Sequence, residues 1–483
     1  MMEKSRKVLC YIYWGLMFVV YPFVMTDGYF NISKAKLTGF YLVSIVLIMG
    51  TVFNLIMMTN KRRILFLNEI KENRIFIGLC TGCFLSILLT GIINKNLIYS
   101  MGGEYEYGVG FIFLTILIIN VLCVNGFHGN SIVYTYLALA PGCIVATMSL
   151  LQYMGVDVAG MLVVVLDEQR QLLIGTFGNL AFTGFYFVIL FPIAVYGFVS
   201  NEAKTLGIVS MVFLSIGVII TNTDGTLLAF VVEWIAMLFL LKKDKEKASM
   251  LFIVAIIIMM SWGALGFINI YSHGYIRLDA VERAAISLPV VIGGLIAAVC
   301  GFALTKWAGN GKWLVVVSWT LLIVLIMYPV MCAVYTLHPF GNTASFLGKL
   351  FYFDYNWGTD RGYLWRSAVA IFVDGSFAQK LFGRGTGSFL QAYLYDYSYG
   401  IDAIEMGLYS NEDAHNIYLQ FLCEYGAVGV GLALGAIIYR LRTRFGSGDL
   451  FLQLRAVAFI GAMVSSAFLV VQGITLGFFG VIL

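Results

Sequence analysis

Apolar runs of about 20 residues recur along the whole chain, and they restrict the possible folds more than any other feature. A helix of that length crosses a hydrocarbon layer of roughly 30 Å and satisfies its own backbone hydrogen bonds there. The pattern therefore predicts an all-α polytopic membrane protein with about 13–14 transmembrane helices. We expect these helices at residues 8–26, 37–58, 75–93, 107–126, 132–153, 176–199, 204–221, 226–241, 249–270, 285–305, 312–334, 413–439 and 453–471, with a last apolar run from Gly473.

The composition excludes a soluble fold. Hydrophobic residues make up 60% of the 483 residues, charged residues only 12%, and the mean hydropathy is +0.90. The first apolar run is long and lacks a small-residue cleavage site, so we expect a first membrane helix and not a cleaved signal peptide. Most of the 30 lysines and arginines fall in alternate loops, which predicts a cytoplasmic N-terminus.

The sequence predicts no metal site and no cofactor. It contains no Asp-x-Asp pair, Walker loop, His-Glu-x-x-His or Gly-x-Ser-x-Gly motif. All eight cysteines lie in apolar runs, and we interpret the Cys80-x-x-Cys83 pair as packing because no His or acid stands beside it. The net charge of +4 fits contact with anionic lipid head groups, and nucleic acid is not an expected partner.

One long loop at residues 335–412 divides the chain. We expect membrane helices 1–11 at residues 1–334, an extracytoplasmic loop domain at 335–412, and C-terminal membrane helices at 413–483. The loop is rich in aromatic residues, which either stack on sugar rings or pack the loop onto itself and the membrane interface. Helical spacing at 361–374 predicts a short helix with Arg361 and Trp365 on one face.

A second outward region, at residues 154–178, carries Arg170. Its apolar stretch "AGMLVVVL" is too short to cross a membrane, which suggests a re-entrant or interfacial element. The guanidinium of Arg170 offers a planar fork to phosphate oxygens, although a lone interfacial arginine also commonly contacts lipid head groups.

The stretch "EDAHNIYLQFLCEYGAVGVG" opens a long apolar helix with His415, which we place in the first helical turn. A neutral imidazole there could accept a hydroxyl proton, and the positive helix end could hold a diphosphate. The alternative is an interfacial histidine that caps the helix or hydrogen-bonds within the bundle.

This arrangement resembles the bacterial O-antigen ligase and O-antigen polymerase family. The resemblance begins with His415-Asn416, which nine residues separate from Gly426-x-x-Gly429, with Glu424 before the first glycine. We expect the two glycines to let this helix pack closely on a neighbour, and Glu424 to pair within the bundle.

Two further segments extend the resemblance to roughly residues 165–440. "RGYLWRSAVAIFVDGSFAQKLFGRGTGSF" is similar to the family's Arg-x-x-x-Trp helix and its glycine-rich segment, without the proline of the latter, and "GTFGNLAFTGFY" is similar to the family's "GTFGNPN" motif. The chain departs from the family at Asn179-Leu180-Ala181, where Asn-Pro-Asn is common, and at Thr223-Asp224-Gly225, where Ser-Arg-Gly is common.

The resemblance implies a metal-independent glycosyltransferase of GT-C-like architecture in a bacterial plasma membrane. Its donor would be an undecaprenyl-diphosphate-linked oligosaccharide at the outer face, and a flippase and a chain-length regulator would be its protein partners. The implied catalytic residues are His415, at the acceptor hydroxyl, and Arg361, which shares the leaving diphosphate with Arg170. The other implied substrate-binding residues are Asn179, Trp365, Arg366, Arg384 and Asn416.

Three functions remain open at this stage. The helix number and the aromatic loop favour a polymerase, which transfers the glycan to a second lipid-linked sugar, over a ligase, which transfers it to a lipid or protein. A transporter or flippase for lipid-linked sugars would predict inverted repeats and polar residues near the bilayer midplane. We find no internal repeat, and Asp224 and Glu233 are the best candidates for such polar residues.

Overall fold

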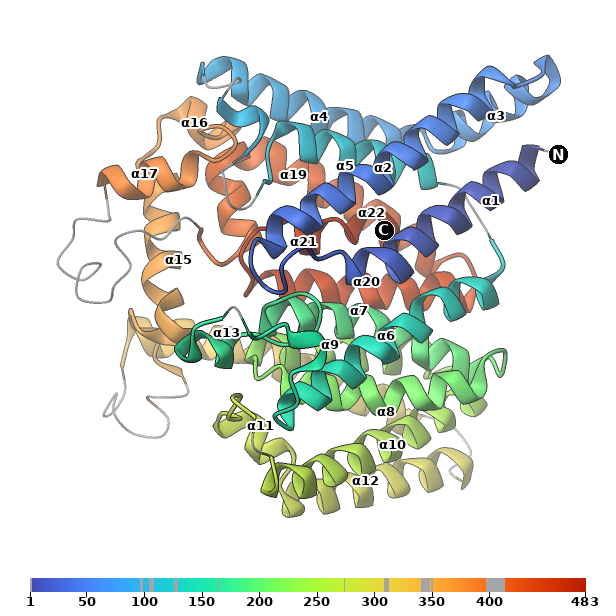
Figure 1. Cartoon of the computed structure of the whole chain (residues 1–483), viewed down its shortest axis with the longest axis vertical. Coiled ribbons are helices and arrows are strands. Elements are labelled where there is room, and N and C mark those ends of the chain that lie inside the picture. The colour runs from blue at the N-terminus through green and yellow to red at the C-terminus, as the bar shows by residue number, and fades with distance from the viewer. Residues whose placement is uncertain are drawn as a thin grey trace.

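The computed structural model describes residues 2–95, 99–103, 108–125, 129–163, 165–272, 274–307, 312–339, 348, 351–396 and 413–483. These residues form helices and connecting turns, without a β-strand (Figure 1). Within them, nine helices are long and apolar enough to cross a membrane, which confirms the predicted polytopic all-α fold. The nine are α2 (Ile32–Ile56), α4 (Arg74–Ile93), α6 (Ser131–Tyr153), α7 (Leu180–Val199), α9 (Asp224–Leu241), α10 (Lys245–Ile270), α12 (Leu288–Trp307), α13 (Lys312–Leu337) and α19 (Ile417–Phe445).

Shorter helices complete the bundle. Four apolar segments are shorter than the nine spans: α5 (Phe111–Val124), α8 (Lys204–Ile220), α20 (Leu450–Ser466), and the pair α21 (Gly473–Leu476) and α22 (Phe479–Ile482). The remaining helices are α1 (Met2–Gly15), α3 (Asn60–Glu72), α11 (Ala280–Ala285), α15 (Trp357–Asp374), α16 (Phe377–Phe382) and α17 (Ser388–Asp396).

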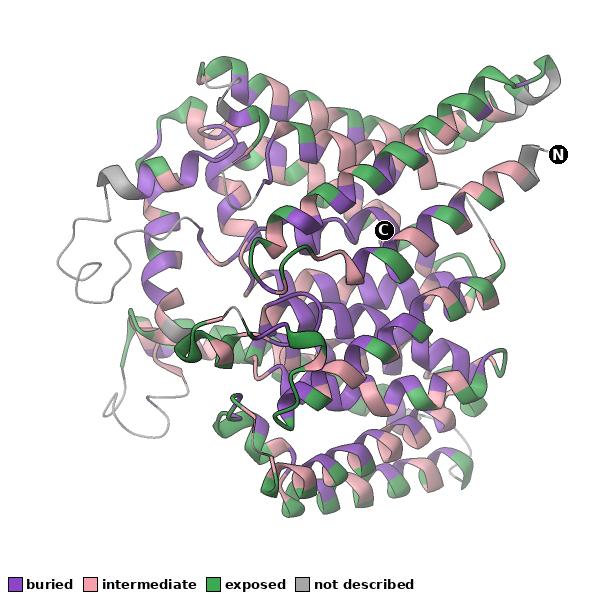
Figure 2. Ribbon diagram, in the orientation of Figure 1, coloured by how far each residue is buried: buried purple, intermediate pink, exposed green. Residues whose placement is uncertain are grey.

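Helix α7 is the centre of the core. It is apolar on every side, and all residues of its most hydrophobic 18-residue stretch are buried, as the purple ribbon in Figure 2 shows. It packs against α8, α20 and α6. By contrast, only 11% of the residues in the most hydrophobic 18-residue stretch of α13 are buried. The apolar side chains of α13 therefore face outward, as expected of a lipid-facing helix.

The long loop folds into helices at one end of the bundle. Helix α15 contains the predicted helix at 361–374, and α16 and α17 follow it, so that α15, α16 and α17 lie together at the left of Figure 1. The second outward region contains two 3₁₀ turns, Val158–Gly160 and Asp167–Leu172, and no longer helix. Glu412 and residues 397–411, including part of the aromatic "YLYDYSY" stretch, lie outside the described residues.

The predicted start of the helix after this loop was wrong. We expected it close to Asp413, with His415 in the first turn, but α19 begins at Ile417 and Asn416 is its N-cap. The reason is local: the Asp413 side chain accepts the N–H of His415 in a turn ahead of the helix, and the Asn416 side chain caps the helix by accepting the N–H of Tyr418.

A kink in α19 attaches the loop helices to the bundle. Gly426 has φ 65° and ψ −174°, which interrupts the helix and frees upstream carbonyl groups. The carbonyls of Cys423 and Glu424 then accept hydrogen bonds from the backbone N–H groups of Arg384 and Gly385, at 3.0 Å each. A Cβ atom at Gly426 would lie 2.5 Å from the backbone of Gly383, so the close approach requires glycine.

Gly429 allows a second close contact. A Cβ atom built on it would lie 3.1 Å from Ser86 Oγ of α4, and α4 packs extensively on α19. The expected close packing of this helix through Gly426 and Gly429 is therefore confirmed.

Gly426→Ala should destabilise the protein by about 1–3 kcal/mol, because the new methyl group collides with the 381–383 backbone at a positive φ. The midpoint of thermal unfolding in detergent measures this change. Gly431→Ala is the matched control, since a Cβ atom on Gly431 of the same helix meets nothing within 4 Å. Equal midpoints for both variants would contradict the proposed role of the kink.

Candidate active site at the start of α19

A buried carboxylate organises the turn before α19. Asp413 is 1% exposed and accepts the backbone N–H of His415 at 2.5 Å and that of Val471 at 2.9 Å. The first bond closes an Asx turn in which His415 takes the left-handed conformation, with φ 50°. A histidine in that conformation is strained, and such strain is typical of functional positions.

Asn416 fixes the direction of the helix. Its side-chain oxygen accepts the N–H groups of Tyr418 and Leu419 at 3.0 and 3.1 Å, as an N-cap does. Since the amide oxygen is occupied, its amide nitrogen is the group that remains to contact a ligand.

Arg361 reaches the same place from the first turn of α15. Its guanidinium donates to the carbonyl oxygens of Gly358 at 2.7 Å and Phe468 at 3.3 Å. It lies close enough to His415 and to Asp224, the first residue of α9, for their charges to interact. The structure thus brings together the two residues implied as catalytic.

Burial and the charge of Arg361 keep His415 neutral. Burial first, and then the nearby guanidinium, lower the pKa of His415 to about 4, while its contact with the Asp413 backbone acts in the opposite direction. An unfolded histidine titrates near 6.5. Between about pH 6.5 and 4 the unfolded chain binds a proton at His415 and the folded protein does not. The free energy of unfolding therefore decreases as the pH falls through this range.

The geometry also indicates which imidazole nitrogen is basic. His415 Nδ1 lies 3.3 Å from the carbonyl oxygen of Asp413, which a neutral ring can contact only as a donor. That hydrogen bond leaves Nε2 without a proton. Because 29% of the His415 side chain is exposed, a substrate hydroxyl can approach the ring.

An outward groove of about 740 Å³ adjoins this turn. It runs between α15 and the start of α19 and is lined by Phe353, Trp365, Arg366, Asn416 and Tyr418, among others. Trp365 packs between the rings of Trp357 and Phe468, and Arg366 stacks on Tyr355 at 4.9 Å. Three of the implied substrate-binding residues, Trp365, Arg366 and Asn416, therefore share one surface.

Three other implied residues have local partners instead. Arg170 forms an ion pair with Asp167 at 2.9 Å and donates to the Tyr275 hydroxyl at 2.8 Å, and the structure gives it no contact with Arg361 or His415. Asn179 caps α7 by accepting the N–H of Ala181. Arg384 donates to the carbonyl of Ile371 in α15.

Sequence reasoning missed two parts of the site. Asp413 was not among the predicted site residues, although its spacing two residues before His415 is that of an Asx turn. The segment between α20 and α21 was predicted as the end of a helix at residues 453–471, but α20 ends at Ser466, and the Phe468 carbonyl and Val471 N–H after it contact Arg361 and Asp413.

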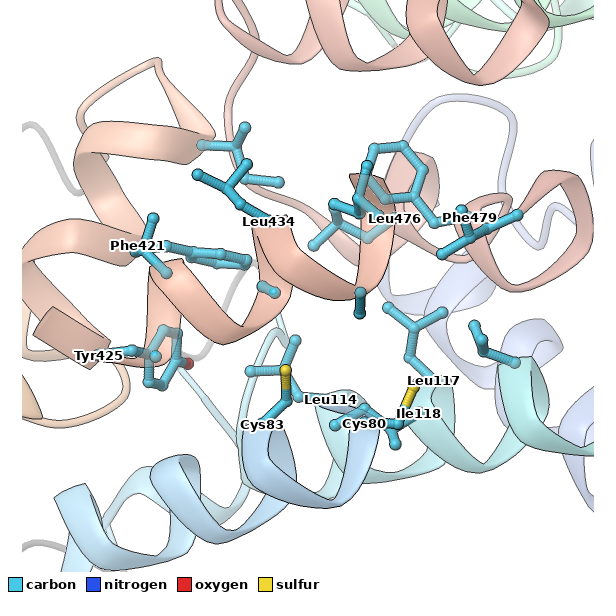
Figure 3. A pocket seen from close by; sticks show the side chains of 18 of the residues that line it. Cys80, Cys83, Leu114, Leu117, Ile118, Phe421, Tyr425, Leu434, Leu476 and Phe479 are labelled. Carbon is cyan, nitrogen blue, oxygen red and sulfur yellow. The ribbon is translucent and has the colours of Figure 1, made fainter. Parts of the chain in front are cut away.

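An apolar cavity of about 190 Å³ lies within the bundle, lined by residues of α4, α5, α19 and the C-terminal helices (Figure 3). On α19 its lining begins at Ile417 and Tyr418 and continues along one face through Phe421, Tyr425 and Gly429. Cys80 and Cys83 of α4 line the opposite wall as free thiols. Tyr418 lines both this cavity and the outward groove, and its hydroxyl donates to the Met463 carbonyl at 2.8 Å.

A comparison with known protein families finds a match, and it overlaps this site. Residues 284–434 match the family described as O-Antigen ligase. This match supports the resemblance of the region to the O-antigen ligase and polymerase family. The matched segment contains Arg361, Trp365, Arg366, Arg384, His415 and Asn416, whereas Arg170 and Asn179 lie outside it. No curated protein matches the chain. The match supports glycan transfer of the O-antigen ligase or polymerase type.

The electrostatic link between Arg361 and His415 is testable. In ¹⁵N-histidine NMR, the signal that His415→Ala removes should titrate near pH 4. Arg361→Gln should raise the pKa of His415, because removing a nearby positive charge favours the imidazolium. Arg366→Gln is the control and should leave the pKa of His415 unchanged. The Arg366 guanidinium stacks on Phe353 and Tyr355 instead. An unchanged value in Arg361→Gln would disprove the interaction.

Proposed function

We propose that this protein is a polysaccharide polymerase of a bacterial plasma membrane, with a cytoplasmic N-terminus. It transfers an undecaprenyl-diphosphate-linked glycan to a sugar hydroxyl of a second lipid-linked glycan at the outer face. The observation that carries this proposal is the proximity of Arg361 and a neutral His415 within the segment that matches the O-antigen ligase family.

In the proposed reaction, the acceptor hydroxyl oxygen attacks the anomeric carbon of the donor, and the bond from that carbon to the diphosphate oxygen breaks. His415 Nε2 takes the hydroxyl proton, while Nδ1–H stays on the Asp413 carbonyl and holds the ring in place. Asp413 is a positioning residue in this scheme, since it touches the histidine and not the substrate.

The leaving diphosphate gains negative charge as its bond breaks. In this proposal Arg361, whose charge acts on His415, stabilises the developing charge, and a guanidinium matches phosphate oxygens in a bidentate manner. A diphosphate is already a good leaving group, so the proposed chemistry requires no metal. The local partners of Arg170 do not support its implied share in this role.

The apolar cavity and the outward groove suit the lipid part and the glycan part of a lipid-linked sugar. The apolar cavity begins directly after the His415 turn and would hold the isoprenoid units nearest the diphosphate. The groove beside it presents Trp365 and Phe353, whose faces can stack on sugar rings. Tyr418, which lines both, would separate the lipid from the glycan.

A ligase differs from a polymerase only in its acceptor, so the acceptor decides between them. Purified protein supplied with one lipid-linked repeat unit, in buffer containing EDTA, should produce a ladder of longer glycans. Product that forms only when a different lipid or protein acceptor is added would identify a ligase. Co-purification tests the flippase and the chain-length regulator as partners.

In the same assay, His415→Ala should lower the rate about 10²–10⁴-fold through loss of the base. Arg361→Ala should lower it about 10²–10³-fold through loss of charge stabilisation. Arg442→Ala, an exposed arginine at the far end of α19, is the control and should remain active. Gel filtration verifies that each variant is folded. Full activity of both site variants would refute the assignment.

The apolar cavity gives a separate prediction. Ala433→Phe, whose ring would occupy the cavity, should raise the KM for a full-length polyprenyl donor by roughly tenfold, because losing about 1.4 kcal/mol of apolar contact weakens binding tenfold. A donor with a short prenyl chain should be affected much less. Ala427→Phe on the exposed face of α19 is the matched control. Equal effects on both donors would place the lipid elsewhere.

A further inference from the structure

A second, polar cavity of about 590 Å³ lies at the opposite end of α19 from His415. Helix α19, with 29 residues and the kink at Gly426, separates the two sites. Four arginines line this cavity: Arg6 of α1, Arg440 and Arg444 of α19, and Arg455 of α20. Glu69 and Glu72 also line it, which leaves a formal excess of two positive charges.

Among the described residues, only one of these arginines forms an ion pair with a side-chain carboxylate. Arg6 forms an ion pair with Glu69 at 3.0 Å. Arg444 and Arg455 donate to the backbone carbonyls of Ile482 and Val481, the latter at 2.6 Å, and Arg440 donates to the main-chain oxygen of Leu483 at 3.1 Å. A carbonyl satisfies a donor but does not neutralise a charge.

Two of the three are buried deeply. Arg444 is 3% exposed and Arg455 is 8% exposed, and the Nε–H group of each has no hydrogen-bond partner in the part of the chain that the structure describes. Aromatic faces flank the guanidinium groups: Arg455 lies 4.9 Å from the Trp14 ring and Arg440 lies 5.5 Å from the Phe76 ring. Buried charges without a counter-ion are strongly unfavourable, and in membrane proteins they mark functional sites.

We propose that this cavity binds a phosphate anion between Arg440, Arg444 and Arg455. Guanidinium groups match phosphate oxygens in shape and charge, and each has five N–H donors, more than the single carbonyl bond uses. The remaining wall is largely apolar, with Leu9, Leu55 and Ile77 among its residues. This mixed lining favours the phosphate of a membrane lipid over a soluble phosphate. The site is distinct from the proposed transfer site.

The test uses native mass spectrometry of the full chain in detergent. Wild-type protein should retain phosphatidylglycerol but not diacylglycerol with the same acyl chains. Arg440→Gln and Arg444→Gln should each weaken that binding about tenfold or more, as expected for the loss of a charge-assisted hydrogen bond. Arg442→Gln, which is exposed and does not line the cavity, is the matched control and should bind like wild type.

The outcomes are distinct. Stabilisation by inorganic phosphate that Arg440→Gln abolishes, without a phospholipid adduct, would assign the site to a soluble phosphate. Wild-type binding in both cavity variants, or an equal loss in Arg442→Gln, would overturn the proposal. Arg440 is only half-buried, so Arg440→Gln supplies the test if Arg444→Gln fails to fold.

Discussion

The candidate site depends on one buried carboxylate. Asp413 joins the turn before α19 to the segment after α20 by accepting one N–H group from each. The same segment supplies the Phe468 carbonyl to Arg361, so the loop helix α15 is attached there as well. Burial raises the pKa of Asp413 to about 7, and the two N–H donors act against that rise. The carboxylate is maintained at this depth because its oxygens are hydrogen-bonded.

An apolar bundle confines polar chemistry to its two ends. Helix α7 fills the centre with buried side chains, which leaves no room there for a solvated substrate. Helix α19 connects the ends: His415 precedes its first turn, and Arg440 and Arg444 lie in its last turns. The apolar cavity follows the same helix inward from the histidine. One helix therefore contributes to the proposed transfer site, to the apolar cavity and to the cavity lined by the four arginines.

The sequence predicted the helices better than the contacts of the site. Apolar runs are a direct consequence of the lipid environment, so they identify membrane helices without tertiary information. Arg170 shows the limit, because an arginine three residues after Asp167 can satisfy its charge locally, and spacing alone does not reveal whether it does. The role of Val471 and the Phe468 carbonyl was also hidden, since backbone groups carry no signature in a sequence.

The negative charge of Asp224 offsets part of the positive charge of Arg361. Where the resembling family commonly has the arginine of Ser-Arg-Gly, this chain has a carboxylate, and that carboxylate interacts with Arg361. In the absence of substrate, Asp224 partly neutralises the guanidinium. A bound diphosphate would be attracted to Arg361 and repelled by Asp224, so the net attraction is smaller than an isolated arginine would give. Much of the donor's affinity must then come from its lipid and its sugars, which the apolar cavity and the aromatic groove are suited to hold.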